Sequence, residues 1–140
     1  MRLKAGLLLT MLAILGSGQD ASRFEGKWQA RLKEEVICTI ELGAGETPRG
    51  AMIDCRVNID ADGNLTEADP SDDPDQRMPI SKARIASGVL TFQDKEGDDT
   101  EVLKFEMRIV GGDVAELLLV NFPAGVKPKP IRFTRLSSNR

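Results

Sequence analysis

Hydrophobic and polar residues alternate along much of this chain. In residues 24–32, apolar or small side chains occupy every second position, from Phe24 through Trp28 to Leu32, and polar side chains lie between them. Alternation of this length is typical of a β-strand with one buried face, because successive side chains of a strand point to opposite sides. The same pattern recurs in residues 36–42, 51–60 and 103–109. These segments are therefore predicted to be half-buried strands.

Shorter apolar runs continue the series of predicted strands. They cover residues 80–85, 89–93, 114–120 and 131–136, with turn-forming pairs at Ser87-Gly88 and Gly111-Gly112. Residues 66–79 are acidic and contain several prolines, which predicts an exposed loop. Eight or nine consecutive strands joined by short turns favour an all-β, antiparallel up-and-down barrel, since closure leaves no exposed edge. A two-sheet β-sandwich is the alternative architecture.

The N-terminal residues predict a signal peptide rather than part of the fold. Arg2 and Lys4 precede an apolar run at residues 5–15, and the small residues Gly16 and Gly18 follow it. The run is shorter than the roughly 20 apolar residues that a membrane-spanning helix needs. We expect cleavage after Gly18, which leaves residues 19–140 as one domain of a secreted or periplasmic protein. An uncleaved N-terminal anchor is the alternative.

Composition narrows the possible functions. The chain has a net charge of −3 and its basic residues are scattered, so we expect neither nucleic acid nor an anionic membrane surface as a partner. It contains no histidine and no tyrosine, which excludes histidine-based nucleophile pairs, histidine metal ligands and phenolic acids. We therefore expect that the protein is not an enzyme. We also expect a monomer with no membrane span after cleavage.

Two cysteines lie on the predicted buried faces of neighbouring strands. If the hairpin is symmetric about residues 43–50, Cys38 lies directly opposite Cys55, and Ile40 lies opposite Ile53. Directly opposed residues of an antiparallel pair have Cα atoms about 4.5 Å apart, which is within the disulfide range. A disulfide is thus predicted in an oxidising compartment. Two reduced, packed thiols are the alternative.

One acidic segment resembles the calcium loop of an EF-hand. Residues 58–69 carry oxygen-bearing side chains at the first, third and fifth positions, glycine at the sixth and a carboxylate at the twelfth. The candidate ligands are Asn58, Asp60, Asp62, Asn64 and Asp69. The alternative is a β-turn at Asp62-Gly63 between strands whose outward residues are acidic. Calcium is the one cofactor that the sequence suggests.

The segment Gly26-Lys27-Trp28 resembles the Gly-x-Trp motif in the first strand of lipocalins and related small barrels. In that family the Trp closes one end of the barrel and a late Arg packs across it, a part that Arg135, or Arg132, would play here. The layout is also similar to that of small secreted bacterial β domains of uncharacterised function. The similarity includes Asp-Gly-Asn-Leu at residues 62–65, Gly-Val-Leu-Thr-Phe at residues 88–92 and Pro-Ile-Arg-Phe-Thr-Arg at residues 130–135.

A lipocalin-like barrel implies a non-catalytic binding module. Such a module would hold a small apolar ligand inside, or present a surface to a protein of the cell envelope. Its interior would be lined by Trp28, Ile40, Ile53, Leu103, Phe105, Met107 and Leu117. The alternative is a purely structural domain, because a barrel of about eight strands can be filled by its own side chains.

A second resemblance is to bacterial periplasmic inhibitors of metalloproteases. These are small barrels in which Gly-x-Trp is followed by Cys-x-Ile-x-Leu and a second, bridged cysteine. The matching residues are Gly26, Trp28, Cys38, Ile40, Leu42 and Cys55. The resemblance implies that residues 19–23 would block a protease.

Overall fold

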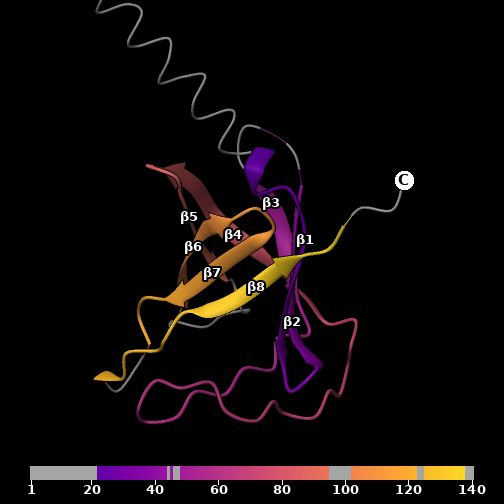
Figure 1. Cartoon of the computed structure of the whole chain (residues 1–140), viewed down its shortest axis with the longest axis vertical. Coiled ribbons are helices and arrows are strands. Elements are labelled where there is room, and N and C mark those ends of the chain that lie inside the picture. Colours follow the sequence, from indigo (N-terminus) through magenta and orange to yellow (C-terminus); the bar gives the residue numbers. More distant parts are fainter. Residues whose placement is uncertain (1–21, 44, 46–47, 95–101, 123–124, 138–140) are drawn as a thin grey trace, which may run out of the picture.

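Eight antiparallel strands close into a barrel in which each strand pairs with the next and the last pairs with the first (Figure 1). The computed structural model describes residues 22–43, 45, 48–94, 102–122 and 125–137. The strands are β1 (Gly26–Leu32), β2 (Glu35–Gly43), β3 (Arg49–Ile53), β4 (Arg77–Ala86), β5 (Val89–Asp94), β6 (Lys104–Gly111), β7 (Val114–Leu119) and β8 (Ile131–Arg135). The predicted antiparallel up-and-down barrel is confirmed, and the sandwich alternative is wrong.

The predicted signal peptide at residues 1–18 lies outside the described residues, as do residues 19–21 of the predicted inhibitory segment. Within the described ranges, the chain forms no helix with the length and apolar character needed to cross a membrane.

Two-residue turns join several of the strands. The predicted turn at Ser87-Gly88 is present, and both residues have positive φ, at 53° and 77°. This conformation suits tight hairpins because its twist matches that of the flanking strands. The predicted turn at Gly111-Gly112 is displaced by one residue: Gly111 pairs with Val114, so the turn consists of Gly112 and Asp113. The cause is a register shift between Ile109 and Gly111, which leaves an extra residue in β6.

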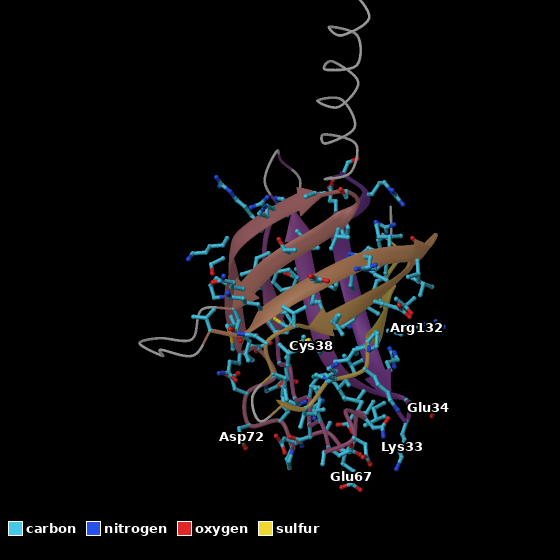
Figure 2. The ribbon with its side chains drawn as sticks, turned by 90° about the vertical axis from the view of Figure 1, so that its left-hand side faces the viewer. Lys33, Glu34, Cys38, Glu67, Asp72 and Arg132 are labelled. Carbon is cyan, nitrogen blue, oxygen red and sulfur yellow. A yellow bond between two sulfur atoms is a disulfide. The ribbon has the colours of Figure 1, made fainter. Side chains whose placement is uncertain are left out.

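The strand connections divide the barrel into two ends of different character. One end carries the β4–β5 and β6–β7 turns together with the start of β1 and the end of β8, and we call it the closed end. The other end carries the β1–β2 turn and the long connection of residues 54–76, and we call it the loop end. Figure 2 shows Glu67 and Asp72 of that connection beyond the strands, on the same side as the turn residues Lys33 and Glu34.

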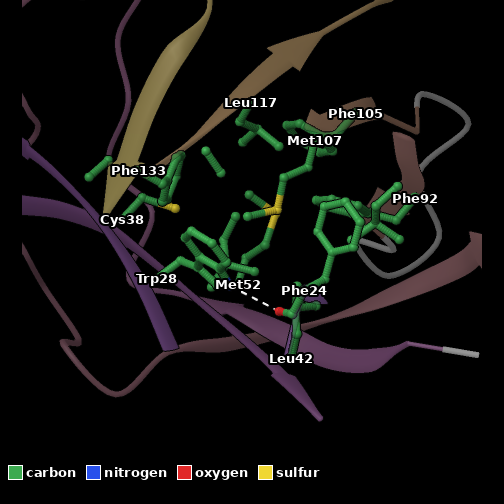
Figure 3. Close-up of a cluster of buried hydrophobic side chains, with 14 of the residues drawn as sticks. Phe24, Trp28, Cys38, Leu42, Met52, Phe92, Phe105, Met107, Leu117 and Phe133 are labelled. Atoms are coloured by element: carbon green, nitrogen blue, oxygen red, sulfur yellow. Dashed lines mark hydrogen bonds between the residues drawn. The ribbon is translucent and has the colours of Figure 1, made fainter. Parts of the chain in front are cut away.

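Large apolar side chains form one buried cluster in the barrel interior (Figure 3). The largest fully buried ones are Trp28, Phe92, Phe133, Ile37, Ile40, Leu90, Met107 and Cys38. Burial of each large apolar side chain stabilises the fold by about 1.5–3 kcal/mol relative to leaving it exposed. The alternating pattern of the sequence thus identifies the buried face of most strands correctly.

The predicted pairing of β2 with β3 is wrong by one residue. Ile40 lies opposite Met52 rather than Ile53, and Leu42 lies opposite Gly50 rather than Ala51. Gly50 is required in this register because a Cβ there would overlap the backbone carbonyl of Glu41. A shift of one residue exchanges the two faces of a strand. Met52 therefore joins the core, and Ile53 is only partly buried.

The third strand is shorter than its alternating sequence predicts. It ends at Ile53, whereas the pattern continues to Asp60. Asp54 takes a positive φ of 48°, and its N–H donates to the carbonyl of Gln76 at 2.9 Å. The chain therefore leaves the sheet here and returns only at Arg77, the first residue of β4. Inside this connection, Ile59 and Leu65 form an isolated antiparallel bridge.

Candidate functional site

The closed end is sealed by Trp28 and Arg135, which face each other on the paired strands β1 and β8. The Trp28 indole is fully buried, and its Nε1–H donates to the carbonyl of Phe24 at 3.0 Å. The guanidinium carbon of Arg135 lies 4.4 Å from the centre of the indole ring. This distance is within the range of a cation–π interaction. The pair therefore covers the interior at this end.

Arg135 also ties together three separate parts of the chain at the closed end. Its Nη1 donates to the carbonyls of Arg23 and Glu25 at 2.7 and 3.0 Å, just before β1. Its Nη2 donates to the carbonyl of Gly112 at 3.2 Å, and its Nε donates to the Asp113 carboxylate at 2.9 Å. One side chain thus fixes the entry to β1 and the β6–β7 turn against β8.

Gly26 makes room for this arrangement. A Cβ at Gly26 would lie 2.9 Å from Cδ of Arg135, and Gly26 has a φ of 132° that side-chain-bearing residues rarely adopt. The structure therefore brings Gly26, Trp28 and Arg135 together. Arg132, the other candidate for this position, is largely exposed and lies 3.7 Å from the Glu116 carboxylate on the outer wall.

The loop end encloses a cavity of about 260 Å³ between the strands and the connection of residues 54–76. Most of its lining is apolar. The lining residues are Cys38, Met52, Asp54, Cys55, Val57, Ile59, Gln76, Met78, Asp94, Leu103, Phe105, Leu117, Leu119, Phe122, Ile131 and Phe133. The stacked rings of Phe92 and Phe105, whose centres are 5.2 Å apart, connect the packed core to the cavity wall. The barrel is therefore filled at one end and hollow at the other.

Three of the seven predicted lining residues face this cavity. Leu103, Phe105 and Leu117 belong to its wall. Trp28, Ile40 and Met107 are fully buried in the packed core, outside the cavity lining. Ile53 is also absent from the lining, because the register shift in β3 puts Met52 there in its place. The prediction of an interior location is thus right for most of these residues, and the prediction of a cavity contact is wrong for four.

Several cavity residues were missed by sequence reasoning. Phe133 and Ile131 lie in a strand whose alternation already marks them as inward, so that signal was present. Val57 and Ile59 have the alternation of a strand but reach the cavity from a loop. Phe122 lies beyond β7, outside any alternating segment, and the sequence gives no signal for it.

The predicted disulfide is confirmed, although its setting differs from the prediction. Cys38 of β2 and Cys55 are bonded, with Cα atoms 4.0 Å apart, and both line the cavity. Cys55 lies two residues beyond the end of β3, so the bond joins β2 to the long connection rather than two facing strand residues. The N–H of Arg56 donates to the carbonyl of Ile37 at 2.7 Å and continues this attachment. A disulfide is compatible with an extracellular or periplasmic location.

The polar groups of the cavity wall are mainly acidic. Asp94, the last residue of β5, is only 5% exposed, and its Oδ1 accepts a hydrogen bond from the N–H of Leu103 at 3.0 Å. Asp54 accepts a hydrogen bond from the Ser71 hydroxyl at 2.9 Å and lies 3.3 Å from Nε of Arg56. No lysine or arginine is among the described residues that line the cavity.

Three of the predicted calcium ligands, Asn58, Asp60 and Asp69, make side-chain hydrogen bonds within their own loop. One carboxylate oxygen of Asp60 accepts the N–H groups of Asp62 and Asn64, each at 2.9 Å. The Asn58 side-chain amide donates to the Asp69 carboxylate at 2.9 Å. In the part of the chain that the structure describes, no three or more Asp, Glu, Cys or His side chains are grouped so as to hold a metal ion. Calcium binding stays a prediction, which calorimetry with millimolar calcium tests.

This acidic loop also packs against the connection between β7 and β8. The N–H of Gly63 donates to the carbonyl of Asp60 at 3.0 Å and forms a β-turn. The carbonyl of Gly63 accepts the N–H of Lys129 at 2.8 Å, and the Lys129 ammonium donates to the Asn64 amide oxygen at 2.6 Å. The two long connections of the loop end are therefore joined to each other.

The two ends of the barrel thus differ in chemistry. Trp28 and Arg135 close one end with packing and hydrogen bonds, and the other end holds a largely apolar cavity with a buried carboxylate in its wall. Sites for small molecules in proteins are typically concave and mostly apolar, with a few polar groups in the wall. No protein-family model, no curated protein and no solved structure matches this chain.

Proposed function

We propose that this protein is a non-catalytic, lipocalin-like binding module that holds a small apolar molecule in the cavity at the loop end. We further propose that it acts outside the cytoplasm, in a secreted or periplasmic form, with which the Cys38–Cys55 bond is compatible. The observation that carries the proposal is the hollow itself. A purely structural barrel of eight strands does not require a cavity, because its own side chains can fill the interior.

The size of the cavity restricts the ligand. Its volume of about 260 Å³ is slightly below the range of about 300–1,000 Å³ that is typical of ligand pockets. The flexible thioethers of Met52 and Met78 in its wall can adapt to ligands of different shape. We therefore expect a short aliphatic or small ring compound. For eight-carbon compounds, we expect dissociation constants of about 10 µM to 1 mM.

Methionine methyl groups provide a direct readout of binding. Met52 and Met78 line the cavity, whereas Met107 is fully buried outside it and serves as an internal reference. In a ¹³C-methyl methionine NMR titration with 1-octanol, we expect saturable shifts of the Met52 and Met78 signals. The Met107 signal should move much less. Uniform movement of all three signals, or no saturable shift, would contradict the proposal.

A matched pair of variants separates cavity binding from surface binding. Leu119→Trp places a larger side chain in the cavity wall, and Val120→Trp makes the same change at the next residue, which is 45% exposed and outside the lining. We expect Leu119→Trp to abolish the octanol-induced shifts and Val120→Trp to leave them unchanged. Equal binding by both variants would place the ligand elsewhere.

A further inference from the structure

We infer that the Cys38–Cys55 disulfide is a redox switch for ligand binding: reduction of the bond by an external dithiol loosens the cavity wall and weakens binding. This inference rests on the proposed function and adds a means of regulation to it. It follows from the place of the bond, from the way in which residues 54–76 are otherwise held, and from the different exposure of the two cysteines.

The bond lies in the part of the cavity wall that the long connection supplies. Both cysteines line the cavity, and so do Val57 and Ile59, which follow Cys55 closely and belong to no strand. Figure 2 shows Cys38 where the strands meet the loop end. The bond therefore attaches to β2 the segment that closes this side of the cavity.

Apart from this bond, the connection is held by few buried contacts. Residues 54–76 contribute none of the buried apolar residues of the core, and three of their apolar side chains pack against that core while only partly buried. Hydrogen bonds provide further attachment, from the N–H of Arg56 to the carbonyl of Ile37 and from the N–H of Lys129 to the carbonyl of Gly63. Segments with few buried apolar contacts open at a lower free energy than core strands. Without the bond, the connection should therefore open while the barrel stays folded.

The two cysteines differ in their accessibility to a reductant. Cys38 is 1% exposed, whereas Cys55 is exposed. A thiolate of the dithiol therefore attacks Sγ of Cys55 and forms a mixed disulfide with it, and the electron pair of the broken bond leaves on Sγ of Cys38, which takes a proton from water. The second thiolate of the dithiol then attacks the sulfur of its own molecule in the mixed disulfide and releases Cys55, which is also protonated. The protein disulfide thus gains two electrons and two protons, and the dithiol becomes a disulfide.

Ligand binding and reduction are coupled in both directions. If reduction weakens binding by a given factor, bound ligand makes reduction less favourable by the same factor, because the two effects are one coupling free energy. The apparent affinity of the reduced protein falls in proportion to the fraction of molecules in which the connection is closed. We expect the connection to be closed in about one fifth or less of the reduced molecules, which corresponds to a factor of about five or more.

Two measurements on the unmodified full chain test this coupling. In titrations with 1-octanol followed by the Met52 and Met78 methyl signals, we expect the dissociation constant to be at least about fivefold higher with excess dithiothreitol than without it. The β-sheet signal in circular dichroism should stay unchanged. In buffers of reduced and oxidised dithiothreitol, saturating octanol should raise by the same factor the reagent ratio at which half of the protein is reduced.

Each outcome decides a different point. Equal dissociation constants for the oxidised and reduced proteins overturn the inference and leave the proposed function intact. Loss of the β-sheet signal on reduction also overturns the inference, because the barrel rather than the connection would then depend on the bond. Failure of octanol to bind the oxidised protein overturns the proposed function itself.

A variant and a trapping experiment serve as controls. Cys38→Ala/Cys55→Ala has no bond to reduce, so dithiothreitol should leave its affinity for octanol unchanged, and an equal loss of affinity there overturns the role of the bond. If this variant does not fold, the comparison of oxidised and reduced protein still decides the inference. Brief treatment of the oxidised protein with glutathione, followed by acid quenching and peptide mass mapping, should find the mixed disulfide on Cys55. A mixed disulfide mainly on Cys38 overturns the assigned point of attack.

Discussion

Removal of the disulfide tests how the long connection is held over the barrel. The bond between Cys38 and Cys55 closes a loop with a sequence separation of 17 residues. In the chain-entropy model, a crosslink over a loop of this length stabilises the folded state by about 3 kcal/mol, because it restricts the unfolded chain. Reduction of the bond in otherwise unchanged protein should therefore lower the free energy of unfolding by about that amount.

Urea denaturation followed by Trp28 fluorescence measures this effect. Trp28 is fully buried at the closed end, so its emission reports loss of the core. The oxidised and reduced proteins are compared under the same conditions, and the reduced protein should show a lower midpoint and a larger denaturant slope, since its unfolded state exposes more surface. The Cys38→Ala/Cys55→Ala variant should be at least as destabilised as the reduced protein, because Cys38 is buried and its removal leaves a void.

Two results would refute this reasoning. Equal free energies of unfolding with and without reductant, within about 0.5 kcal/mol, would mean that the crosslink adds nothing to the attachment that Arg56 already provides. Loss of ellipticity typical of a β-sheet on reduction would mean that the barrel itself depends on the bond, and that the connection is not a separate layer.

Three further predictions concern the closed end and the outer wall. Arg135→Lys should lower the free energy of unfolding by about 1–3 kcal/mol in urea denaturation, because an ammonium cannot span the four acceptors that the guanidinium reaches. Gly26→Ala should lower the free energy of unfolding by at least about 1 kcal/mol, because the new Cβ meets the Arg135 side chain and the positive φ is also unfavourable. Gly88→Ala is the control: the space around its Cβ position is open, so only the positive φ should lower the free energy of unfolding. Hydrogen bonds and ion pairs with Arg77 and Lys27 hold the pKa of Glu41 below its ordinary value, so its contribution to stability should be present above the ordinary carboxyl pKa and lost as the pH falls through the lowered one. Glu41→Gln should remove this acid-dependent contribution from plots of unfolding free energy against pH.

Alternation in the sequence predicts the barrel well because it records a local property. Each strand has one face toward the interior, and residues such as Trp28 and Phe105 repeat at the period that this geometry demands. The alternating pattern does not determine the register between neighbouring strands. The β2–β3 pairing depends on how closely Gly50 approaches the backbone of Glu41, which is a tertiary contact that no periodicity encodes.

The cavity lies beyond what the alternating pattern can predict. Val57 and Ile59 continue the apolar alternation of β3, but they belong to a connection that folds over the barrel and lines the hollow. Phe122 reaches the same hollow from beyond β7. A void is defined by the distances between such segments. Sequence reasoning could therefore predict that residues like Leu103 and Leu117 are internal, but not that they border empty space.

The barrel interior is packed around Trp28 and hollow at the loop end. A crystal structure of the protein under xenon pressure tests this most directly, because xenon enters apolar voids without requiring a specific ligand. We predict xenon density in contact with Met52, Phe105 and Leu117, and none beside Trp28. A structure in which side chains fill that volume and no xenon binds would contradict the claim.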